Sequence, residues 1–243
     1  MKFYQYTSTL LIIALLSVVI ACSDGTGERV PLKGEVTYDI SYSDDITKSS
    51  EFGTFLPHTV KGLYDTTNIK LVINAPMGLV NVSCVVSNVE DFVAVDFDNA
   101  KLLLTMSELL DLDDAKVIAE NLKITEFPGS TLIAGYTSQH VCITPDLADQ
   151  EETRIDVFFV PFHERPEGNI TIADLFRAKL EKRGSSPGVV TALNIRMGES
   201  NIMLRATKIE SNEKVSTKDF ERPGGHILAS RKDLMSMVDI MLN

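Results

Sequence analysis

Period-two alternation of apolar and polar residues runs through most of this sequence and restricts the fold more than any other feature. Val36, Tyr38 and Ile40 alternate with Thr37 and Asp39, as expected of a strand with one buried face. Similar stretches recur about every 10 to 12 residues, which favours an antiparallel sheet over strand–helix alternation. They cover residues 69–73, 80–86, 92–97, 101–106, 123–127, 131–144, 153–160, 189–197 and 201–209.

Three short segments have the apolar periodicity of helices instead. They span residues 112–122, 171–184 and 231–242, and Asp111, Thr171 and Ser230 are placed as their N-caps. Because several strands have one polar face, the sheet should be covered mainly on one side. We therefore predict a mainly β (α+β) fold, a large twisted antiparallel sheet that three helices cover.

The first 22 residues have the pattern of an export signal. Lys2 is followed by residues 10–21, which are apolar apart from Ser17 and too short for a membrane span of about 20 residues. The last four, Val19-Ile20-Ala21-Cys22, resemble the lipobox of bacterial lipoproteins. That resemblance implies cleavage between Ala21 and Cys22, lipidation of the Cys22 thiol, and attachment to the membrane by the lipid.

Two other interpretations of this stretch remain, an ordinary signal peptide with a chance cysteine and an uncleaved anchor. In the lipoprotein interpretation, residues 1–21 are the signal peptide and residues 22–33 a flexible tether. Residues 34–243 then form a single β-rich domain. We expect a cell-envelope location, at the outer membrane, with its periplasmic or surface side left open.

Composition excludes some partners. The net charge of −11 would repel the phosphates of nucleic acid and does not suit a polybasic lipid-binding face. Cys84 and Cys142 are the two cysteines besides Cys22. In an exported protein they form either one disulfide or two separate buried thiols, and the sequence alone does not supply the spacing that decides.

Five short segments resemble an uncharacterised family of Bacteroidetes envelope lipoproteins, which is in turn similar to the LolA/LolB-like lipoprotein-carrier superfamily. They are Gly34-Glu35-Val36-Thr37-Tyr38 with Tyr42-Ser43-Asp44-Asp45, Phe55-Leu56-Pro57, Ile133-Ala134-Gly135-Tyr136, residues 202–209, and Phe220 before Pro223. The resemblance implies a curved half-barrel whose concave side is covered by about three short helices and holds acyl chains. Residues 137–140 depart from the family, which often has a lysine and a cysteine there. No catalytic residue is implied.

The sequence contains only incomplete matches to known catalytic motifs. Residues 184–188 match G-x-S-x-G around Ser186, and Asp219 and His226 follow in hydrolase order. The nucleophile elbow, however, needs a strand before the serine and a helix after it, whereas the reverse is predicted here. His140 and Cys142 share one face of a strand, as a thiolate–imidazole pair or half a metal site would, but two bystander residues explain the pattern better.

Other motifs have structural explanations. His163-Glu164 lacks the second histidine of a zinc-protease helix, and Pro166 would break that helix. The aspartates at 96–98 and 111–114 lack the glycine and glutamate of a calcium loop. We predict no metal and no cofactor. Met235, Met237 and Met241 either line an adaptable lipid pocket or pack a terminal helix.

The leading functional hypothesis is a non-catalytic, lipid-anchored envelope lipoprotein that binds a lipid or another apolar ligand in its concave sheet. An accessory or structural subunit of an envelope complex is the first alternative, and a serine hydrolase the second. The expected partners are the membrane, through Cys22, and an apolar ligand or envelope protein.

Overall fold

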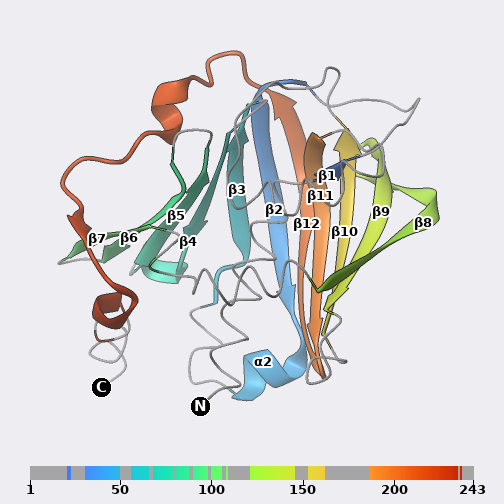
Figure 1. The fold of residues 1–243 in the computed structure, drawn as a ribbon, viewed down its shortest axis with the longest axis horizontal. Coiled ribbons are helices and arrows are strands. Elements are labelled where there is room, and N and C mark those ends of the chain that lie inside the picture. The colour runs from blue at the N-terminus through green and yellow to red at the C-terminus, as the bar shows by residue number, and fades with distance from the viewer. Residues whose placement is uncertain are drawn as a thin grey trace.

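One sheet organises the protein (Figure 1). The computed structural model describes residues 21–22, 31–49, 56–65, 68–78, 80–87, 90–97, 100–105, 108, 121–145, 153–161, 187–234 and 236. In this part of the chain, 66% of residues are strand and 11% helical. The strands form a 13-stranded sheet, ordered β13-β7-β6-β5-β4-β3-β2-β12-β11-β10-β9-β8, with β1 paired to β11 off this path. All pairings are antiparallel except that of β13 with β7.

The strands are mostly five to twelve residues long, with a two-residue strand near each end of the chain. Their bounds are β1 Ala21–Cys22, β2 Gly34–Tyr42, β3 Thr59–Tyr64, β4 Ile69–Asn74, β5 Val80–Val86, β6 Phe92–Phe97, β7 Lys101–Thr105, β8 Leu122–Ile133, β9 Tyr136–Pro145, β10 Thr153–Pro161, β11 Pro187–Met197, β12 Ser200–Ser211 and β13 Ile227–Leu228.

Two meanders meet in the middle of the sheet. Strands β2 to β7 pair with their sequence neighbours, and so do β8 to β12. The first and last long strands join the halves, since β2 pairs with β12 from Gly34↔Ser211 to Tyr42↔Ile202. Figure 1 shows the consequence: the blue β2 lies beside the orange β12 at the centre, and β4–β7 and β8–β10 lie to either side.

The first face of the sheet is mostly apolar. Alternate positions such as Val36, Tyr38, Leu71, Val157 and Leu193 are almost completely buried and belong to one large cluster. The period-two pattern of these strands therefore predicted their buried face correctly, including that of Cys84, which packs against this cluster with its neighbouring valines.

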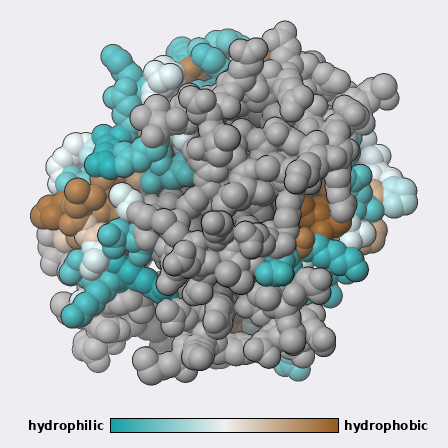
Figure 2. Space-filling model, in the orientation of Figure 1, coloured by the Kyte–Doolittle hydropathy of each residue, from teal (hydrophilic) through white to brown (hydrophobic). Residues whose placement is uncertain are grey.

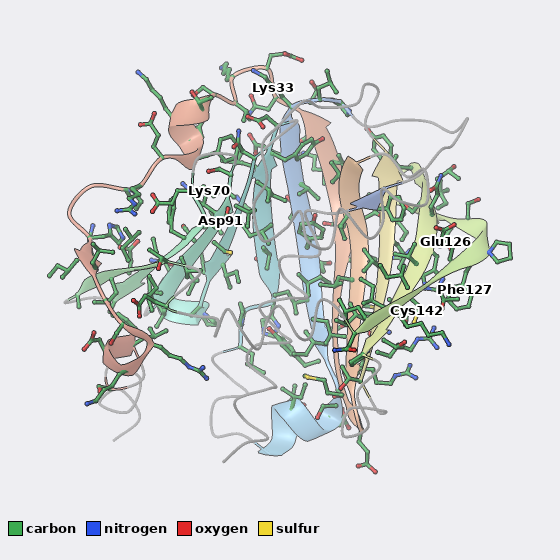
Figure 3. All side chains as sticks on the ribbon, viewed as in Figure 1. Lys33, Lys70, Asp91, Glu126, Phe127 and Cys142 are labelled. Carbon is green, nitrogen blue, oxygen red and sulfur yellow. The ribbon has the colours of Figure 1, made fainter. Side chains whose placement is uncertain are left out.

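The second face differs between the two halves of the sheet. Over β5–β7 it is covered by residues 212–220, whose Val215 and Phe220 are buried against Val85, Phe92, Ala94 and Leu103. Lys33 Nζ donates to the Val215 carbonyl (3.4 Å) and Lys70 Nζ to the Asp219 carbonyl (3.3 Å), which ties this segment to the sheet. Both lysines lie near its path in Figure 3. An irregular segment with a single 3₁₀ turn, Thr217–Phe220 (η4), thus covers this half of the face.

The predicted cover of three helices is wrong. In the described part of the chain the single complete α-helix is α2, Asp44–Ser49, and it lies outside the three segments for which helices were predicted. The expected helix at 112–122 ends inside a strand, because Leu122 begins β8 and pairs with Pro145. Short apolar stripes are ambiguous between helix and strand, and here sheet pairing decides. Residues 112–120 and 171–184 lie outside the described residues.

The terminal helix begins where its cap was predicted. Residues 231–234 are helical, and Ser230 Oγ accepts a hydrogen bond from the Asp233 backbone N–H (3.3 Å). Leu234 packs against the large apolar cluster.

One strand boundary was missed. Residues 131–144, predicted as one strand, contain a hairpin turn at Ala134 (φ 51°) and Gly135 (φ 87°).

Candidate functional site

The predicted lipidation residue lies at one end of β11. The backbones of Ala21 and Cys22 pair with Gly188 and Pro187, where β11 begins. The strand β2 begins at Gly34. The division into signal peptide, tether and domain, and the lipidation of Cys22, stay predictions.

The disulfide alternative is not formed. Cys84 on β5 and Cys142 on β9 both carry free thiols. In the strand order, β4, β3, β2, β12, β11 and β10 lie between them. A disulfide needs Cα atoms within about 7 Å, whereas neighbouring strands are already nearly 5 Å apart.

The hydrolase triad is not assembled among the described residues. Asp219 accepts hydrogen bonds from Ser216, through its backbone N–H (2.8 Å) and its hydroxyl (3.1 Å). His226 Nε2 instead lies 2.9 Å from Asp96 Oδ1. Ser186 lies outside the described residues, and the strand β11 starts directly after it, where an elbow would require a helix.

The methionines predicted either to line a lipid pocket or to pack a terminal helix are Met235, Met237 and Met241. All three lie outside the described residues.

A stack of three rings occupies the second face at the β8–β10 end of the sheet. The His140 imidazole lies between Phe127, with ring centroids 4.6 Å apart, and Phe158, at 4.3 Å. The three residues are directly opposite one another in the register of β8, β9 and β10. Figure 3 shows Phe127 and Cys142 near this edge, on the neighbouring strands β8 and β9.

The edge of the imidazole contacts a carboxylate. His140 Nε2 lies 2.7 Å from Asp156 Oδ1. Arg154 donates to the same carboxylate through Nε (2.8 Å) and through a terminal nitrogen (2.7 Å), and its guanidinium lies 5.8 Å from the Phe127 ring centre. Because an ionised carboxylate only accepts hydrogen bonds, His140 must carry its proton on Nε2.

The electrostatics of this cluster keep the Asp156 carboxylate ionised and the Cys142 thiol protonated. Burial acts to raise the pKa of Asp156, but the hydrogen bonds from Arg154 and His140 outweigh it and hold the pKa below its usual value. Burial and the Asp156 charge together raise the pKa of the neighbouring Cys142 thiol. A protonated thiol is a poor nucleophile and a poor metal ligand. No group of three metal-ligating side chains occurs in the described part of the chain.

Sequence patterns predicted only part of this cluster. They placed His140 and Cys142 on one face, but they did not indicate Phe127, Arg154, Asp156 or Phe158. The signal for three of them was present in β10, where Arg154, Asp156 and Phe158 alternate with the buried Ile155, Val157 and Phe159. Only the strand register brings them beside His140.

Comparisons with known proteins give little further information. No family model matches the sequence, and no significant match occurs among curated proteins. A structure of PNGF-II is similar with a TM-score of 0.47 and 12% identity, over 85% of this chain and 32% of that one. This chain thus spans about a third of that protein's length. An outer membrane lipoprotein-sorting protein domain from Vibrio parahaemolyticus gives a TM-score of 0.34 and 9% identity, over 78% of this chain and 89% of that domain.

Neither likeness is strong enough to carry an argument about function. A lipoprotein-sorting domain is among the similar structures, as the expected resemblance to lipoprotein carriers implied, but only at this weak level. The proposed link to a Bacteroidetes family receives no support. What the fold defines is a class: proteins built on one large, open, antiparallel β-sheet.

Proposed function

We propose that this protein is a non-catalytic, lipid-anchored envelope lipoprotein that binds a lipid or another apolar ligand against the first face of its sheet. The observation that carries the proposal is the continuity of that face. Its buried apolar residues come from both meanders and form one cluster, from Leu102 and Leu104 on β7 to Leu122 and Ile124 on β8.

Polar side chains inside this apolar region would orient a ligand. The Tyr38 hydroxyl donates to the Val190 carbonyl at 2.8 Å, and the hydroxyls of Ser138 and Thr191 lie 2.6 Å apart, both pairs being buried. Ligand sites typically combine a mostly apolar lining with a few placed polar groups. Burial also raises the pKa of Tyr38 and Tyr64 well above the usual value, so both stay neutral at any physiological pH.

The lipobox resemblance supports attachment through Cys22, and no helix of the described residues is long and apolar enough to cross a membrane. Two or three acyl chains would hold the protein at a bilayer, since each buried methylene contributes about 0.8 kcal/mol. A Cys22→Ala variant that is correctly exported should leave the membrane fraction. Continued complete partition into membranes would contradict this part of the proposal.

Ligand binding is tested on the protein extracted from membranes in a non-ionic detergent. Mass spectrometry of the bound lipids, and titration with a fluorescent fatty acid, should both detect one apolar ligand per chain. An Arg205→Ala variant on the second face is the matched control and should bind the fatty acid as well as the original protein. Absence of both co-purified lipid and fatty-acid affinity would exclude ligand binding.

An accessory subunit of an envelope complex is the second candidate. It is favoured by the β8–β12 half of the second face, whose exposed side chains include Phe127 and Met203. Crosslinking in whole cells followed by purification should give one stable partner in this case, and no apolar ligand.

A further inference from the structure

The second face of β8–β12 carries a group of cations that we call the basic patch. It consists of Lys123, Arg154, Arg196 and Arg205, which lie on alternate positions of four strands and so point to one side of the sheet. Arg154 faces Arg196 in the register, and Arg196 faces Asn201. Lys123, Arg196 and Arg205 are exposed, and none of these three makes an ion pair with another described residue.

Among the described residues, few carboxylates offset this charge. Asp156 is already bound by Arg154 and His140. Asp39 lies opposite Arg205 at the border with β2. Counted over the described residues, the basic patch thus keeps a net positive charge, on a chain whose overall charge is −11. Like charges on neighbouring strands destabilise a sheet. The adjacent Arg154 and Arg196 therefore lower the stability of the protein on its own, and a bound anion would remove this repulsion.

We propose that the basic patch is the docking surface for an acidic segment of a partner protein. Guanidinium groups bind carboxylates in a bidentate geometry, and Arg154 already shows this arrangement with Asp156. Exposed Phe127 and Met203 lie among the cations, at 40% and 36% exposure. Arginine, methionine and aromatic residues are the types that protein interfaces enrich.

A protein partner fits this surface better than the lipid bilayer does. Cys22 pairs at Pro187, whereas Arg196 lies nine residues further along β11. At about 3.3 Å per residue, these positions are roughly 30 Å apart. That is nearly four Debye lengths at physiological ionic strength, so the anchor by itself does not bring this end of the patch into the field of an anionic membrane.

This inference goes beyond apolar ligand binding and uses the proposed function only for the position of the anchor. The two are therefore separable: loss of fatty-acid affinity would leave the basic patch untouched, and loss of acidic-partner binding would leave the apolar face untouched.

The first experiment uses the lipidated protein in phosphatidylcholine vesicles, with poly-L-glutamate as the probe. The double variant Arg196→Ala/Arg205→Ala should weaken poly-L-glutamate binding at least tenfold, and 0.5 M salt should have a comparable effect. Lys208→Ala is the matched control, because Lys208 is an exposed cation of β12 but is paired with Glu210 at 2.7 Å. Equal binding by the original protein and both variants would overturn the proposal.

The second experiment separates a protein partner from a lipid surface. A fluorophore at Thr125→Cys, an exposed position beside the patch, reports contact with lipids that carry a quencher. Quenching should be equally low with and without phosphatidylglycerol in the vesicles. Strong quenching that requires phosphatidylglycerol would assign the patch to the bilayer and overturn the proposal.

The third experiment identifies the contact in cells. A photocrosslinking amino acid at position 203 should give one adduct, which Arg196→Glu/Arg205→Glu abolishes and Lys208→Glu retains. The adduct should map to a segment of the partner rich in aspartate and glutamate. An adduct that survives the charge reversal would overturn the proposal, and thermal unfolding of each variant checks that its fold is intact.

Discussion

His140 Nε2 and Asp156 Oδ1 lie 2.7 Å apart, although their residues are not opposite one another in the sheet. In the β9–β10 register His140 faces Phe158, and Asp156 faces Cys142. This diagonal contact leaves the imidazole faces free to stack on Phe127 and Phe158 while its edge holds the carboxylate. With both faces and one edge occupied, His140 is a structural residue that fixes β8, β9 and β10 together.

The first prediction concerns the pH dependence of this contact. The folded-state pKa of Asp156 is lowered, so its ion pairs stabilise the fold above the unfolded-state pKa of about 4 and are lost as pH falls through the folded-state value. Asp156→Asn should reduce the free energy of unfolding by about 1–3 kcal/mol at pH 7. Urea unfolding at pH 7, 5 and 3 should show this difference shrinking below pH 4.

The exposed Asp39 provides the control, because Asp39→Asn should change stability by no more than about 0.5 kcal/mol. A destabilisation by Asp156→Asn that is as large at pH 3 as at pH 7 would show that the ion pairs are not its cause.

The second prediction concerns the thiols. Burial and the neighbouring Asp91 raise the pKa of Cys84 to about 12, and burial with Asp156 raises that of Cys142. At pH 8 a Cys22→Ala variant should therefore react slowly with iodoacetamide, and both thiols should react rapidly in 8 M urea. Mass spectrometry over time measures this. Rapid labelling of Cys142 in the folded protein would contradict this prediction and show that its thiol is reactive.

The third prediction concerns Gly34, where β2 begins. A Cβ at this position would collide with the Glu210 carbonyl and the Tyr64 ring. The Glu210 carbonyl belongs to the paired strand and has no room to move, so Gly34→Ala should cost about 1–3 kcal/mol or more. Gly224→Ala is the control, because no atom lies within 4 Å of its added Cβ. Thermal unfolding of the two variants should differ clearly, and equal melting temperatures would contradict the close β2–β12 approach.

The fourth prediction tests the irregular cover over β5–β7. Phe220 is 4% exposed and packs against Phe92 and Leu103, so Phe220→Ala should cost about 3–5 kcal/mol. Ile227 on β13 is 70% exposed, and Figure 2 shows a strongly hydrophobic surface at the left edge of the molecule. Ile227→Ala should therefore have almost no effect on urea unfolding. A small effect of Phe220→Ala would mean that residues 212–220 do not form part of the core.

Local patterning predicted the strands well and their boundaries less well. The alternation around Val36 and Tyr38 identified β2, and the valines beside Cys84 identified β5 with the correct buried face. The turn at Ala134 and Gly135 was missed because alanine rarely adopts a positive φ, and the single Gly135 inside a strand pattern fits a bulge as well as a turn. The helix expected up to residue 122 was contradicted at Leu122 by pairing with Pro145 on the next strand, a contact that a local apolar stripe does not reveal.

The sequence by itself determined that the chain is β-rich and antiparallel, and which residues of each strand turn inward, because side-chain alternation is a local property of the strand. Only the tertiary structure decided which strands are neighbours. The β2–β12 pairing joins residues more than 150 positions apart, and the register of β8, β9 and β10 assembles Phe127, His140 and Asp156. Such contacts depend on which strand edges meet, and strand edges present the same backbone groups whatever their sequence.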